Sequence, residues 1–85
     1  MNISVEYNSG TKRIFSSFEE CINYSSEYEG DTYDNMKILN CFNNGFTELP
    51  KLPKYLQHLY CYQNRLTELP ELPPNLKLSF QQATM

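Results

Sequence analysis

The sequence predicts an α+β protein: a short solenoid of parallel strands, with two coils and a partial third, capped at its N-terminal end by a β-hairpin and a helix. Three observations lead to this class. The composition changes abruptly near residue 35, a 20-residue pattern occurs twice after that point, and helix-capping residues stand before it. The 85 residues are therefore expected to form one folded unit, with a cap over 1–35 and repeats over 36–85.

Leucine, proline, serine and charge all divide at this boundary. All ten leucines and all five prolines lie after residue 35, whereas six of the seven serines lie before it. Residues 1–35 carry 2 basic and 7 acidic side chains, a net charge of −5, and residues 36–85 carry 5 basic and 3 acidic, a net charge of +2. Neither half is large enough to bury a core alone, so the two halves are expected to share one.

The start of the chain has the pattern of a hairpin. Apolar side chains alternate with polar ones at Ile3, Val5 and Tyr7, and the turn signal Asn-Ser-Gly follows at 8–10. The next residues can return as a second strand, which predicts a hairpin within residues 2–15.

A helix is expected next, over residues 16–29. Ser16 and Ser17 each stand three residues before a glutamate, which is the spacing of a capping box. Gly30 is well placed to end the helix, and residues 31–35 then connect the cap to the repeats. One helical stripe contains Phe18, Cys21, Ile22, Ser25 and Tyr28.

The second half is a repeat with a period of 20 residues. Residues 36–55 and 56–75 match at nine of twenty positions without a gap. Self-similarity at a fixed period is typical of a solenoid, in which each unit buries its apolar face only by stacking on its neighbours. A partial third copy is expected over 76–80, followed by a tail over 81–85.

Each copy begins with the pattern of a short strand. Leu39 and Cys41 alternate and match Leu59 and Cys61, so each pair is expected to form the inward face of one strand. Stacked copies would then form a parallel sheet with one strand per coil.

An asparagine and a proline-containing return segment follow each strand. Asn44 matches Asn64, and each is expected to turn its amide into the bend and bond backbone groups there. The LPxLP segments at 49–53 and 69–73 exclude a helix, because proline fixes φ and removes a donor. Their leucines are expected to fill the core while the prolines face water.

The third copy starts but does not finish. Leu76, Leu78 and Phe80 have strand alternation, and only five residues follow them. Such a strand leaves backbone donors and acceptors unpaired at the edge of the sheet. Pairing of residues 76–80 with a second copy across a two-fold axis predicts a homodimer.

The repeat resembles that of a known family. In the second copy the pattern LxxLxxxxNxLTxLPxLP is carried by Leu56, Leu59, Asn64, Leu66, Thr67, Leu69, Pro70, Leu72 and Pro73. It resembles the short leucine-rich repeat of secreted bacterial effectors, and similar arrays occur in proteins of large DNA viruses of amoebae. The resemblance covers residues 36–80 and implies a repeat that binds proteins.

The same resemblance implies two alternative functions. In some of these effectors the repeats precede a separate ubiquitin-ligase domain, so the chain could be the substrate-recognition part of such an effector or adaptor, with its catalytic part elsewhere. A virion structural component is the weaker alternative.

Charge and composition argue against several classes. A formal net charge of −3 opposes general nucleic-acid binding, which needs a basic surface. No apolar run approaches the roughly 20 residues of a membrane span, so no membrane association is expected. Three cysteines without a CxxC motif favour a reducing compartment, hence the cytoplasm, or the host cytoplasm for a viral or effector protein.

No catalytic site, metal or cofactor is expected. His58 and Cys61 would point to opposite faces of their strand, so they cannot form a base and nucleophile pair. Cys41 and Cys61 are expected to be buried as small hydrophobic side chains. Zinc favours four convergent ligands, whereas the chain offers three cysteines and one histidine.

The candidate site is the outward, concave face of the predicted strands. Aromatic side chains gathered on a strand face are typical of contact surfaces. We therefore expect a protein partner to bind there, unless the N-terminal segment folds over these side chains or they merely pair across strands. The residues concerned are Ile38, Asn40, Phe42, His58, Tyr60 and Tyr62.

Overall fold

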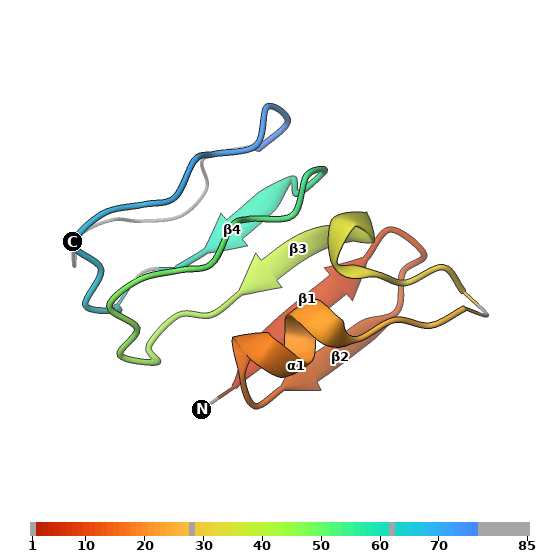
Figure 1. Cartoon of the computed structure of the whole chain (residues 1–85), viewed down its shortest axis with the longest axis horizontal. Coiled ribbons are helices and arrows are strands. Elements are labelled where there is room, and N and C mark those ends of the chain that lie inside the picture. Colours follow the sequence, from red (N-terminus) through yellow and green to blue (C-terminus); the bar gives the residue numbers. More distant parts are fainter. Residues whose placement is uncertain (1, 28, 62, 77–85) are drawn as a thin grey trace.

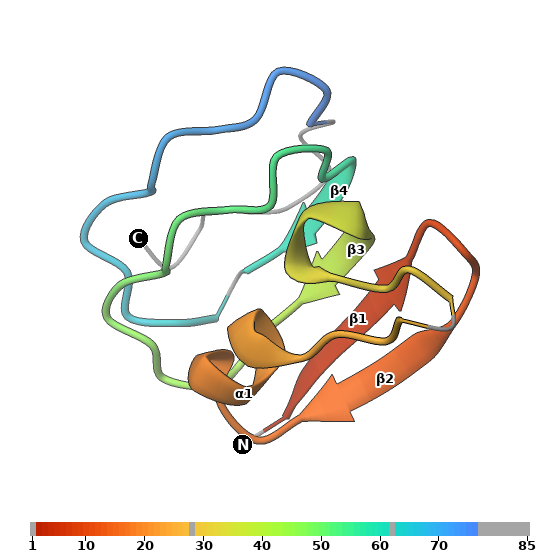
Figure 2. The same ribbon diagram turned by 45° about the vertical axis from the view of Figure 1, so that its right-hand side comes forward.

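Four strands form a single sheet in the computed structural model, which describes residues 2–27, 29–61 and 63–76 (Figure 1). Their order across the sheet is β2-β1-β3-β4. One helix, α1, and the return segments of the repeat lie over the same face of this sheet (Figure 2). The elements are β1 (Ile3–Tyr7), β2 (Lys12–Phe15), α1 (Phe18–Asn23), the 3-10 turn η1 (Tyr33–Asn35), β3 (Met36–Asn40) and β4 (His58–Tyr60).

The sheet is mixed. β1 pairs antiparallel with both β2 and β3, and it has an irregularity between Glu6 and Tyr7. Only β3 and β4 are parallel. Their register places Leu39 beside Leu59, as the 20-residue repeat requires.

The predicted solenoid of parallel strands is therefore wrong. The two copies of the repeat contribute one strand each, and the N-terminal hairpin supplies the other two, joined antiparallel to the free side of β3. Half of the sheet thus comes from residues outside the repeat. The protein is a small mixed-sheet domain and not a leucine-rich-repeat solenoid. The repeat determines the two parallel strands and the segments that follow them, but the sheet is completed by the antiparallel hairpin.

The predicted third strand cannot be followed to its end. Leu78 and Phe80 lie outside the described residues, as does the rest of 77–85. Leu76 is half-buried and follows a turn in which its N–H donates to the carbonyl oxygen of Pro73 at 3.2 Å.

The hairpin expected within residues 2–15 is present as β1 and β2. Gly10 has a φ of +96°, a conformation that glycine adopts without a steric penalty, and its N–H donates to the Tyr7 carbonyl oxygen at 2.9 Å. The turn is also held from outside, because the Ser9 hydroxyl donates to the buried carboxylate of Asp31 at 2.7 Å. This bond ties the hairpin to the connection that leads into β3.

Helix α1 is shorter than expected. Ser17 is its N-cap and accepts the N–H of Glu20 at 3.2 Å, as the capping-box spacing predicts. The helix ends before Tyr24, whose ψ of 137° is extended, and not near residue 29. Gly30 is consequently not a helix cap. It lies in a turn closed by a bridge between Ser26 and Asp31.

The core draws side chains from both halves of the chain. The inward positions predicted for the two strands, Leu39, Cys41, Leu59 and Cys61, are confirmed, since none is more than 2% exposed. Burying such apolar surface stabilises a fold by roughly 25 cal/mol per Å². The buried cluster contains Ile3, Val5, Tyr7, Cys21, Met36, Leu39, Cys41, Leu49, Leu52, Leu56, Leu59, Cys61 and Leu66.

The return segments contain turns and bends rather than helix throughout 41–57 and 63–76. Leu49 and Leu52 are buried as expected, whereas Leu72 in the second copy is 37% exposed. The expectation that the prolines face water is wrong for Pro53, which is fully buried. The chain turns under the core there, and the Leu56 N–H donates to the Pro53 carbonyl oxygen.

The bends that follow β3 and β4 are joined by hydrogen bonds of the Asn64 side chain. The Asn64 amide nitrogen donates to the carbonyl oxygens of Cys41 and Cys61, each at 3.0 Å. Its oxygen accepts the N–H groups of Asn44 and Phe46 at 2.9 and 3.0 Å. Because these four bonds use both donors and both lone pairs of a side chain that is 4% exposed, Asn64 joins the two bends as a buried staple.

Candidate functional site

One face of the sheet is opposite to the core, and we call it the outer face. Along β1, β3 and β4 its residues alternate with buried ones such as Val5, Leu39 and Leu59. The strand register arranges the outer face in two rows across the sheet. One row contains Ile14, Ser4, Asn40 and Tyr60, and the other contains Lys12, Glu6, Ile38 and His58.

Four of the six residues predicted for the partner site lie on the outer face: Ile38, Asn40, His58 and Tyr60, all half-buried. The His58 and Tyr60 rings stack nearly parallel, with centroids 6.5 Å apart and an interplanar angle of 8°. Phe42 lies just beyond β3 and is 41% exposed. Tyr62 is outside the described residues.

The N-terminal segment does not fold over this surface. β1 instead lies beside β3 within the same sheet, so the outer face gains residues that the sequence reasoning missed. The most exposed is Ile14, with 68% of its surface exposed. Ile14 pairs with Ser4, which points away from the core because it lies between the buried residues Ile3 and Val5. With the hairpin register known, this pairing would have placed Ile14 on the outer face.

Two shallow hollows mark the outer face, and they share Ser4 and Asn40. The first, of about 340 Å³, lies between Ile14 on β2 and Ile38 on β3. The second, of about 380 Å³, reaches past the end of β3 to Phe42. The small side chain of Ser4 leaves room between the larger side chains of the neighbouring strands.

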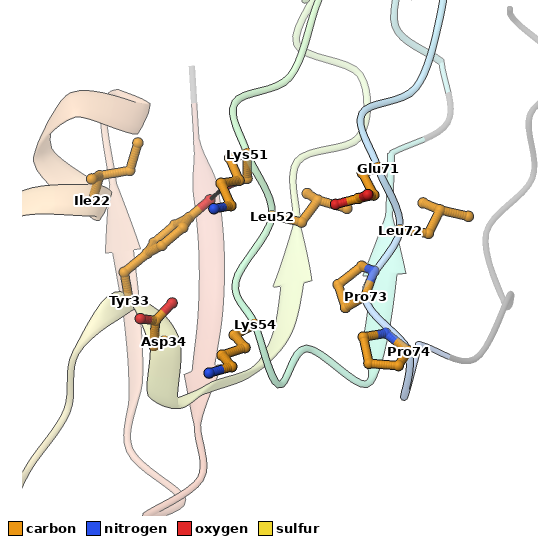
Figure 3. A pocket seen from close by; sticks show the side chains of 10 residues that line it. All are labelled: Ile22, Tyr33, Asp34, Lys51, Leu52, Lys54, Glu71, Leu72, Pro73 and Pro74. Carbon is orange, nitrogen blue, oxygen red and sulfur yellow. Dashed lines mark hydrogen bonds between the residues drawn. The ribbon is translucent and has the colours of Figure 1, made fainter.

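A larger groove of about 860 Å³ lies on the core side, between η1 and the two return segments (Figure 3). The Tyr33 hydroxyl donates to the Lys51 carbonyl oxygen at 2.7 Å and holds the first return segment against η1. Burial raises the pKa of this hydroxyl, which therefore stays protonated and remains a donor. The sequence did not indicate the groove, because it depends on how η1 packs against the return segments.

The three cysteines, Cys21, Cys41 and Cys61, are free and buried. Burial raises the pKa of the Cys21 thiol to about 11 and, with the nearby thiols of Cys61 and Cys21, that of Cys41 to about 12. A protonated thiol is a poor nucleophile. His58 lies on the outer face and Cys61 in the core, and the residues that the structure describes contain no cluster of three side chains that could hold a metal ion.

Because the pKa values of the Cys21 and Cys41 thiols are raised, we expect the free energy of unfolding to decrease at alkaline pH. An unfolded cysteine titrates near its ordinary pKa of 9.0, whereas Cys21 and Cys41 stay protonated to about 11 and 12 in the folded state. Above the ordinary value the unfolded state binds fewer protons, so the free energy of unfolding should fall as the pH rises from 9 toward 11. Urea denaturation at about pH 8 and about pH 10 measures this, and a flat profile would contradict it.

Comparisons with protein-family models, with curated proteins and with solved structures found no match. Among the helices that the structure describes, none has the length and apolar character needed to cross a bilayer. The fold and the site define a small mixed-sheet domain with one face packed on its core and the other facing outward.

Proposed function

We propose that the protein is a non-enzymatic binding domain whose protein partner contacts the outer face. The observation that carries this proposal is that β2, β3 and β4 each place an apolar or aromatic side chain on the outer face. Ile14, Ile38 and Tyr60 stand at outward positions, which in an antiparallel or mixed sheet are usually polar.

The surface has the character of an interface core with a polar rim. The outer face carries one charged pair on β1 and β2, in which Glu6 and Lys12 stand directly opposite one another. Aromatic residues are enriched at the centres of protein interfaces, and here the stacked His58 and Tyr60 rings form the end of the surface on β4. The three free, buried thiols support a reducing compartment, and we place this activity in the cytoplasm.

The test is affinity capture with the immobilised chain. Replacing Tyr60 with alanine removes one of the two stacked rings from the proposed contact, so a captured partner should bind about tenfold or more weakly. Tyr55→Ala is the matched control, because Tyr55 is 48% exposed in the turn before β4 and does not belong to the strands that form the outer face. Equal loss in both variants, or no loss with Tyr60→Ala, would contradict the proposed surface.

A further inference from the structure

The second hollow of the outer face has a composition different from the rest of the surface. Its lining residues carry no formal charge: Asn2, Ser4, Asn40, Phe42, Asn43 and Asn44. Its volume of about 380 Å³ is at the lower end of the range for small-ligand sites, which runs from about 300 to 1,000 Å³. It is therefore large enough for one small, neutral molecule.

The hollow is built on a fixed backbone. The Asn44 amide nitrogen donates to the Asn2 carbonyl oxygen at 2.9 Å, and its oxygen accepts the Asn2 N–H at 3.2 Å. These bonds hold the start of β1 against the bend after β3, and Ser4 pairs directly with Asn40 beside them. A site whose walls are already in place loses less entropy when a ligand binds.

Several polar groups of the hollow remain available. In the described part of the chain, the side chains of Asn2, Ser4 and Asn43 make no hydrogen bond, and Asn40 uses only its oxygen, in a long 3.4 Å bond from the Phe42 N–H. An amide both donates and accepts, and so does a hydroxyl. These groups suit a ligand whose own polar groups both donate and accept hydrogen bonds, such as the hydroxyl groups of a sugar.

An aromatic ring completes this chemistry. Phe42 is 41% exposed at the rim, and the C–H groups on one side of a pyranose ring pack well against an aromatic face. An anionic ligand has no cation among the lining residues, and nucleic-acid binding needs a basic surface that this hollow lacks. An extended peptide would be expected to pair with a sheet edge rather than lie on a face.

From this arrangement we infer that the hollow between the start of β1 and the bend after β3 is a binding site for an uncharged saccharide. The sugar ring stacks on Phe42, and its hydroxyls bond the amides of Asn2, Asn40 and Asn43. This inference does not rest on the proposed protein partner, because the site is complete within one chain.

The experiment is a titration of the isotope-labelled full chain, followed by NMR of the asparagine side-chain amides. The probes are the methyl glycosides of glucose, mannose and galactose, with sorbitol as a hydroxylated molecule that has no ring. We expect saturable shifts of the Asn2, Asn40 and Asn43 amides with at least one glycoside, at a Kd of about 1–10 mM, and weaker binding of sorbitol.

Two variants locate the site. Phe42→Ala should raise the Kd about tenfold through loss of the stacking ring. Asn43→Gly should raise it about fivefold without harming the fold, because Asn43 has a φ of 57° that glycine adopts freely. Tyr55→Ala, an exposed aromatic at the other end of the strands, should bind as the wild type does.

Three results would overturn the inference. One is the absence of saturable shifts with every glycoside at about 100 mM, well above the expected Kd. Another is unchanged binding in both Phe42→Ala and Asn43→Gly. The third is tighter binding of a short oligoadenylate than of any glycoside, which would assign the hollow to a nucleobase. Protein capture on Tyr60 can succeed or fail independently of all three.

Discussion

Asn64→Ala is expected to lower the free energy of unfolding by about 3 kcal/mol. The substitution removes the Asn64 partner of the Cys61 carbonyl oxygen and of the N–H groups of Asn44 and Phe46, while the Cys41 carbonyl oxygen keeps the Asn44 amide as a donor. Buried groups left unsatisfied cost about 1–3 kcal/mol each before the structure relaxes. A domain of this size has only about 5–10 kcal/mol in total, so the variant should be close to unfolding.

Asn44→Ala is the matched control for this prediction. Asn44 occupies the equivalent position in the first copy, but it is half-buried, and its side chain bonds the backbone of Asn2 and the Cys41 carbonyl oxygen. Its loss should cost about 1 kcal/mol, because water can reach the exposed groups. Urea denaturation followed by circular dichroism measures both variants. Equal losses, or a loss under about 1 kcal/mol for Asn64→Ala, would show that the staple is not what joins the bends.

Leu59→Ala should destabilise the protein by a similar amount, about 3 kcal/mol. Leu59 is fully buried in β4 and pairs with Leu39 across the only parallel contact in the described sheet. Removing its side chain leaves a cavity in the core that the sheet shares with the return segments. The measurement is again the free energy of unfolding in urea.

Ile14→Ala provides the contrast for Leu59→Ala. Both substitutions truncate an aliphatic side chain in a strand, but Ile14 is 68% exposed on the outer face. Its loss should change the stability by no more than about 0.5 kcal/mol. If Ile14→Ala proved as damaging as Leu59→Ala, the assignment of the two faces of the sheet would be wrong.

Local features were predictable from the sequence, because each depends on neighbouring residues. Alternation identified the buried faces of β3 and β4 through Leu39 and Leu59. The position of Asn64 shortly after a strand predicted its role in the bend, and Ser17 predicted the start of α1. Each of these signals involves only one turn or one strand, and over that distance the local side chains largely determine the backbone conformation.

The architecture was not predictable, because it depends on which strand edges meet. Nothing in the repeat shows that the N-terminal hairpin would pair with β3 through Val5 and Leu39. That pairing turned an expected solenoid into a mixed sheet, and it extended the candidate surface to Ile14 and Ser4. The hollow beside Phe42 also follows from it, since Asn2 and Asn43 are far apart in the sequence.

The most direct test of the two-faced sheet uses the four isoleucines as reporters. A water-soluble paramagnetic chelate broadens methyl signals in proportion to their exposure. We expect strong broadening for Ile14, which is 68% exposed, and less for Ile22 on α1, which is 41% exposed. The half-buried Ile38 should broaden still less, and the fully buried Ile3 should not broaden. A protected Ile14 methyl, or an Ile3 methyl broadened in the folded protein, would contradict this expectation.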